Sequence, residues 1–201
     1  MPELITSTTP GRPTILVVDV TRDHVGFEHH MTNSMCDELR KRGVDLTENS
    51  PVFPADTDEY FEVFSSTPTF NCLLLVAHGG KDPNDGTVSE IGGPPGLVDW
   101  YSLAALSETL QDKFVMLAVC YGYCTDAISA LTKEDSWALS LLASEVALNS
   151  NEAIAFFPNF FQALSVLCAE YIDPVQIRRA LERHNHLSGN KMKLFSEALP
   201  I

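Results

Sequence analysis

Two stretches of the sequence end in residues that could act together as a nucleophilic pair. In residues 70–82, FNCLLLVAHGGKD, an apolar run leads into His78 and two glycines. In residues 113–124, KFVMLAVCYGYC, a second apolar run leads into Cys120. An imidazole beside a thiol can take the thiol proton and later protonate the leaving amine of an acyl transfer. We therefore treat His78 and Cys120 as candidate catalytic residues.

The glycines near these two residues suit the same chemistry. An acyl-transfer site needs backbone N–H groups that point at the developing oxyanion, and a glycine lets the chain turn with no Cβ in the way. We expect the N–H of Gly79, or of Gly80, and the N–H of Cys120 to form an oxyanion hole. Gly122 is expected to permit the tight turn after the cysteine.

Each residue of the pair also has a purely structural interpretation. A histidine at a strand end can be a hydrogen-bonded boundary residue, and a cysteine at the end of an apolar strand can be a small core residue. The two occur together, on consecutive long strands and with glycines following. That combination favours a functional site.

The elements that would position the pair alternate along the chain. Buried strands are predicted over 14–20, 71–77, 113–119 and 137–144, and helices over 27–42, 56–66, 100–111, 125–132, 150–169 (interrupted by Pro158) and 174–186. Continuous apolar strands that alternate with helices are typical of an α/β domain with a mostly parallel sheet and helices on both faces. Ligands of such sheets bind beyond the carboxyl ends of the strands. His78 and Cys120 would meet there if their strands are neighbours.

The remaining segments fit one domain. Residues 1–13 are predicted to be a flexible N-terminal tail and residues 14–201 a single domain, with a weak strand near 44–46 or 52–53. Residues 79–99 are rich in Gly, Pro, Asp and Asn and read as a long irregular loop, and loops of that length are usually functional or disordered.

Composition limits the partners. The chain has 13 Lys and Arg against 27 Asp and Glu, a net charge of -14, which makes nucleic acid a poor partner. This acidity either attracts basic peptides or simply keeps the protein soluble. The apolar runs fall short of the ~20 residues of a membrane span, and we see no secretory signal. We expect no membrane association.

The cysteines indicate the compartment and the cofactor requirement. Five cysteines without regular spacing argue against a disulfide framework and for a reducing, cytoplasmic location. CYGYC is a C-x3-C pair that no second pair completes as a zinc site. We therefore expect no metal and no cofactor.

The two motifs carry a family resemblance. LLLVAHGG followed by FVMLAVCYG resembles the caspase-like, clan CD cysteine peptidases, in which one apolar strand ends in His-Gly and a later one ends in Cys. The spacing of 42 residues between positions 78 and 120 suits that family. Residues 89–106 and 136–164 are similar to CHAT domains, the bacterial-type branch of the group. The resemblance covers roughly residues 14–169.

The resemblance implies a cysteine endopeptidase of caspase-like fold, in which Cys120 forms a thioester and His78 is the general acid–base. It also implies activation in trans by a regulatory protein partner, as in prokaryotic antiviral defence or cell-death systems. The loop 144–151 would line the cleft. Ser144 and Asn149 are then candidate substrate contacts, although an asparagine there can equally cap the following helix.

Other features leave specificity and activity open. Ala118 stands where the metacaspase branch has an Asp, so that position does not support a basic P1 preference. Arg22 and Asp23, in the loop after the first strand, are the charged candidates for substrate binding. Cys124 is an alternative nucleophile, but Cys120 is favoured because it ends the strand.

The alternative function from a different class is a catalytically silent caspase-like scaffold that binds or regulates other proteins. An amidase on a similar α/β plan is disfavoured, because no G-x-S-x-G nucleophile elbow is present.

Overall fold

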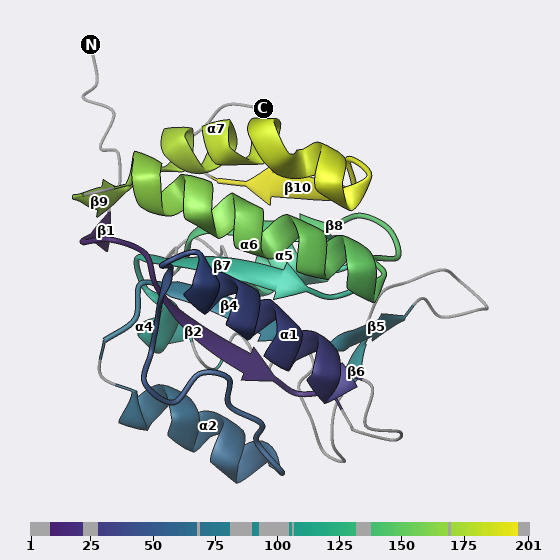
Figure 1. The fold of residues 1–201 in the computed structure, drawn as a ribbon. Coiled ribbons are helices and arrows are strands. Elements are labelled where there is room, and N and C mark those ends of the chain that lie inside the picture. Colours follow the sequence, from purple (N-terminus) through teal and green to yellow (C-terminus); the bar gives the residue numbers. More distant parts are fainter. Residues whose placement is uncertain are drawn as a thin grey trace.

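A six-stranded sheet forms the centre of the computed structural model, which describes residues 9–21, 28–67, 69–80, 90–92, 105, 107–131, 138–168 and 170–196 (Figure 1). The strand order is β10-β8-β7-β4-β2-β3. The strands are β2 (Thr14–Asp19), β3 (Asp45–Leu46), β4 (Cys72–Val76), β7 (Lys113–Ala118), β8 (Ala138–Ser144) and β10 (Met192–Phe195). All neighbours run parallel except β10 and β8. The predicted α/β class with a mostly parallel sheet is confirmed.

Helices cover both faces of this sheet. One face carries α1 (Glu28–Lys41), α6 (Ser150–Leu167) and α7 (Pro174–His184), and the other carries α2 (Thr57–Ser66), α4 (Ser107–Leu110) and α5 (Thr125–Leu131). Figure 1 shows α1 and α6 lying across the near face. Successive strand residues alternate between the two cores: Ile15 packs in the first and Leu16 in the second. This explains why the strands are apolar throughout, because both of their faces are buried.

Helix α6 runs through Pro158, so the predicted interruption at that residue is wrong. An interior proline costs about 3 kcal/mol. Four phenylalanines of the same helix, Phe156, Phe157, Phe160 and Phe161, are fully buried. Each burial contributes about 1.5–3 kcal/mol, which together outweighs the cost of the proline and keeps the helix continuous.

Short strands add pairings that the sequence pattern did not predict. Within the predicted tail, β1 (Thr9–Pro10) pairs antiparallel with β9 (Tyr171–Ile172), so the chain joins the fold at Thr9; residues 1–8 lie outside the described residues. Within the predicted irregular loop, β5 (His78–Gly80) pairs antiparallel with β6 (Glu90–Gly92). The rest of that loop lies outside the described residues.

The weaker predictions have mixed outcomes. Both suggested sites of a short strand are strand-like, because β3 forms at 45–46 and Val52 bridges to Val18. The helix predicted to end at 186 instead ends at His184 and continues as a 3-10 turn over Asn185–Ser188. Across the described ranges, no helix combines the length and apolarity that crossing a membrane requires.

Candidate active site

The sheet places His78 and Cys120 at the same edge. Strands β4 and β7 are parallel neighbours, and Val76 is in register with Ala118. The pairing continues one residue further, where the N–H of Ala77 donates to the carbonyl of Ala118 at 3.5 Å. His78 and Cys120 each lie two residues beyond the Val76–Ala118 pair. The expectation that the two strands are neighbours is confirmed.

Both residues line one cavity of about 260 Å³. His78 is exposed and Cys120 is half-buried. The rest of the lining comes from the ends of β2, β4 and β7, from α1, and from the start of α6: Thr21, Met31, Val76, Ala77, Ala118, Leu148, Asn149, Ser150 and Ala153. The imidazole and the thiol thus belong to the wall of one solvent-accessible pocket.

Gly79 packs directly on the backbone of Cys120. A Cβ at position 79 would lie 1.9 Å from the carbonyl oxygen of Cys120 and 2.7 Å from Cγ1 of Val119, whereas a Cβ at Gly80 would meet nothing within 4 Å. Gly79 is therefore required for a close backbone approach, which brings the segment after His78 onto the cysteine. Gly80 is under no such constraint.

The backbone of Leu148 holds the Cys120 thiol. The Leu148 N–H donates to Sγ at 3.4 Å, and the thiol donates to the Leu148 carbonyl at 3.5 Å. An N–H aimed at sulfur stabilises negative charge there, as hydrogen bonds to ionised groups generally do. This backbone donor was not predicted, because the sequence motif carries no sign of which residue approaches the sulfur from a distant loop.

The turn after Cys120 is made by Tyr121, which adopts the left-handed region at φ 57. We expected Gly122 to permit this turn. Gly122 instead provides room, because a Cβ there would lie 3.3 Å from the Cβ and the carbonyl oxygen of Val119. The left-handed conformation costs a non-glycine residue roughly 1–2 kcal/mol. The Tyr121 N–H donates to the Val146 carbonyl at 3.1 Å, which ties the turn to the neighbouring loop.

That loop is fixed by side-chain hydrogen bonds. Ser144 is fully buried, and its hydroxyl donates to the Val146 carbonyl at 2.9 Å. The Ser144 side chain therefore offers a substrate no exposed surface.

Asn149 caps α6 in a capping box with Glu152. Asn149 also lines the cavity, so its contact with a substrate stays a prediction. Arg22 and Asp23 lie outside the described residues.

Asp19 is a carboxylate at this edge that the sequence interpretation missed. It is 1% exposed and in register with Val76, on the third neighbouring strand. Its Oδ1 accepts hydrogen bonds from the N–H and the hydroxyl of Thr21, while Oδ2 has no hydrogen-bond partner among the described residues. The available signal was a charged residue inside the otherwise apolar run TILVVDV.

Burial disfavours the thiolate form of the other four cysteines. Burial raises the pKa of Cys36 to about 12 and that of Cys168 to about 11, and it raises the pKa of Cys72 well above its ordinary value. The pKa of Cys124 is also raised by burial, and its side chain packs against the core on the sheet face that α2, α4 and α5 cover.

All five cysteines are free thiols. Within the described ranges, no three His, Cys, Asp or Glu side chains are grouped to hold a metal ion.

Comparison with known proteins gives a fold but no family. No protein-family model matches the chain, and no curated protein matches it. A secreted C11 cysteine protease from Bacteroides thetaiotaomicron, solved with an irreversible peptide inhibitor, is similar in structure: TM-score 0.50, 14% identity, covering 78% of this chain and 56% of that one. The Drosophila initiator caspase Dronc gives a TM-score of 0.53 at 12% identity, covering 96% of this chain and 85% of that one.

These neighbours define the class of fold. The chain spans just over half the length of the Bacteroides protease and most of the length of the caspase. It has the caspase-like α/β fold found in clan CD cysteine proteases. The CHAT-like branch stays a prediction.

Proposed function

We propose that this chain is a caspase-like cysteine endopeptidase in which Cys120 is the nucleophile and His78 the general acid–base. The observation that carries the proposal is the juxtaposition of the two residues beyond adjacent parallel strands, in the wall of one cavity. The close approach of Gly79 to the backbone of Cys120 supports it. So does the occurrence of the same fold in cysteine proteases.

The proposed catalytic cycle uses the Cys120 thiol, the His78 imidazole and two backbone N–H groups. Cys120 gives its proton to His78, and the sulfur attacks the peptide carbonyl carbon. The N–H groups of Gly79 and Cys120 donate to the resulting oxyanion. Collapse of this intermediate breaks the C–N bond, and the leaving amine takes the proton from His78. Water then gives a proton to His78 and hydrolyses the thioester. That proton returns to the sulfur, so the cycle needs no metal or organic cofactor.

The finer proposals rest on the sequence resemblance. We propose that the chain belongs to the CHAT-like branch and acts in the cytoplasm, where a regulatory partner activates it in trans. Prokaryotic antiviral defence or cell-death signalling is the proposed setting. Arg22, Asp23 and Asn149 are the proposed substrate contacts.

A catalytically silent scaffold is the second candidate. One observation favours it: the thiol of Cys120 donates to the Leu148 carbonyl. A silent member would keep that hydrogen bond permanently, whereas a protease must release it when the proton moves to His78.

Activity on a positional peptide library separates the two candidates. Wild type is compared with Cys120→Ala, His78→Ala and the control Cys124→Ala. We expect cleavage that is lost in the first two variants and retained in the control. Cleavage that persists in Cys120→Ala would overturn the assignment of the nucleophile. Full retention in His78→Ala would overturn the dyad.

A further inference from the structure

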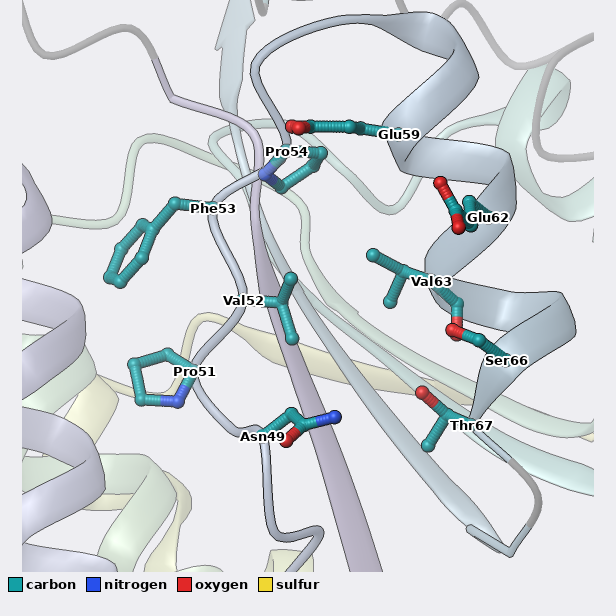
Figure 2. Close-up of a pocket in the computed structure, with 10 residues that line it drawn as sticks. All are labelled: Asn49, Pro51, Val52, Phe53, Pro54, Glu59, Glu62, Val63, Ser66 and Thr67. Carbon is teal, nitrogen blue, oxygen red and sulfur yellow. The ribbon is translucent and has the colours of Figure 1, made fainter.

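A second pocket lies between the segment 49–54 and helix α2, and its volume is about 480 Å³ (Figure 2). It shares no lining residue with the cavity of His78 and Cys120. Pockets of about 300–1,000 Å³ are typical of ligand sites. The lining residues are Asn49, Pro51, Val52, Phe53, Pro54, Glu59, Glu62, Val63, Ser66 and Thr67. We call this pocket the α2 groove.

Both walls of the α2 groove are held by the fold. On one side, the Val52 N–H donates to the Val17 carbonyl and the Val52 carbonyl accepts from Asp19, each at 2.9 Å, so this segment is fixed to the sheet edge. On the other side, α2 is anchored by the buried Tyr60 and Phe64. Figure 2 shows the side chains of Val52 and Val63 pointing toward one another across the space between the two walls. Both walls of the groove are therefore fixed, and its lining combines the apolar side chains of Val52 and Val63 with polar side chains such as Ser66 and Thr67.

The rim of the α2 groove is acidic. Residues 45–67 contain Asp45, Glu48, Asp56, Asp58, Glu59 and Glu62 and no Lys, Arg or His. Glu59 and Glu62 line the groove. The carboxylate of Glu59 is held in place by the Ala55 N–H at 2.7 Å, and within the described part of the chain neither glutamate forms an ion pair. Among the described residues, the basic side chains beside this segment contact other atoms: Arg40 donates to the Ser50 carbonyl, and the His29 ring packs on Phe53.

We propose that the α2 groove binds a segment of another protein that carries Lys or Arg beside apolar residues. Charge complementarity selects this occupant. Residues 1–8 and 197–201 of the chain contain Glu3 and Glu197 and no Lys or Arg, so the termini do not match the rim. A second copy, with its own net charge of -14, is repelled. The proposal does not depend on the proposed peptidase activity.

Binding is tested with the Cys120→Ala protein, which cannot cleave the probe by the proposed mechanism. The probe is a fluorescein-labelled peptide of alternating Arg and Leu, followed by fluorescence anisotropy at low and high salt. A peptide of alternating Glu and Leu and one of alternating Arg and Ser are the comparison probes. We expect the Arg-Leu peptide to bind most tightly, and its affinity to fall with salt.

Matched charge reversals locate the site. Glu62→Arg is expected to weaken binding by about tenfold or more, because it puts a like charge against the peptide at close range. Glu62→Gln should give an intermediate loss. Asp58→Arg makes the same change in net charge on an exposed α2 residue outside the groove lining, and it should keep most of the affinity.

Three results would overturn the proposal. The first is failure of the Arg-Leu peptide to bind. The second is equal affinity of the parent and Glu62→Arg proteins, both shown to be folded by circular dichroism. The third is equal losses in Asp58→Arg and Glu62→Arg, which would indicate diffuse attraction to an acidic protein rather than binding in the α2 groove.

Discussion

Two adjacent glycines have different roles at the residue scale. Gly79 lies against the Cys120 carbonyl, and Gly80 has open space where a Cβ would lie. Gly79→Ala forces the segment after His78 away from the cysteine. We expect a destabilisation of about 1–3 kcal/mol, as for other overpacked sites, and loss of peptide cleavage. Urea unfolding and the library assay measure both effects.

Gly80→Ala is the matched control for this prediction. With nothing within 4 Å of the added Cβ, it should leave stability and cleavage close to wild type. Equal effects of the two substitutions would contradict the assigned role of Gly79.

The sequence could predict the pair but not the contacts around it. His78 and Cys120 stand out because each ends a long apolar run, and the sheet brings such ends together. The contact of Leu148 with the Cys120 sulfur and the close approach of Gly79 depend on where two distant loops pack. No local pattern encodes that packing, so sequence reasoning predicted Gly79 as a turn residue and an oxyanion-hole donor without its close approach to Cys120.

At the scale of elements, the residue before the last described strand, β10, supports the loop that contacts Cys120. Lys191 precedes β10 and donates to both carboxylate oxygens of Glu152, at 2.7 and 2.6 Å. Glu152 forms the capping box with Asn149. Asn149 directly follows Leu148, whose backbone contacts the Cys120 sulfur. The Glu145 N–H also donates to the Lys191 carbonyl at 3.2 Å. Lys191 therefore joins both ends of the loop that contacts Cys120, and we propose that it positions this loop.

Lys191→Met should disturb this support. The side chains of the Lys191–Glu152 ion pair are only 25% and 23% exposed. We therefore expect its removal to lower the free energy of unfolding by about 1 kcal/mol. We also expect a lower rate of Cys120 alkylation. Lys193→Met is the control, because its ion pair with Glu145 is 47% and 49% exposed. A Lys191→Met protein that is destabilised but alkylates at the wild-type rate would limit the pair to a structural role.

The long elements were predictable and the short ones were not. Strands β4 and β7 are continuous apolar runs, and α1 has a clear apolar stripe. Strand β10 has only four residues, MKLF, at the sheet edge: one is charged and exposed, and two are half-buried. Such a strand forms because β8 offers a partner, and its own sequence gives little signal. Pro158 likewise misled the prediction, because tertiary burial of the α6 phenylalanines overrides local propensity.

At the scale of the whole molecule, buried thiols make stability depend on pH. The pKa values of Cys36 and Cys168, about 12 and about 11, lie above their ordinary value of 9.0. Above pH 9 the unfolded chain loses these protons while the folded chain keeps them. The contribution to stability is therefore fully present below pH 9 and is lost as pH rises toward 11 and 12.

The predicted slope is about 1.4 kcal/mol per pH unit for each thiol. Urea unfolding between pH 8 and pH 11 measures it. The double variant Cys36→Ala, Cys168→Ala should have a lower stability but a shallower decline with pH. A decline as steep as that of wild type would show that other groups are responsible.

The most direct test of the Cys120–His78 dyad is competitive alkylation of the folded protein with iodoacetamide, with all five cysteines quantified by mass spectrometry. Thiolate character and access control this reaction. Both Cys120 and Cys124 are half-buried, but burial raises the pKa of Cys124. If His78 acts as the base for Cys120, Cys120 should be modified about tenfold or more faster than Cys124, and His78→Ala should remove most of this difference. Labelling of Cys120 no faster than Cys124, or at a rate indifferent to His78, would contradict the dyad.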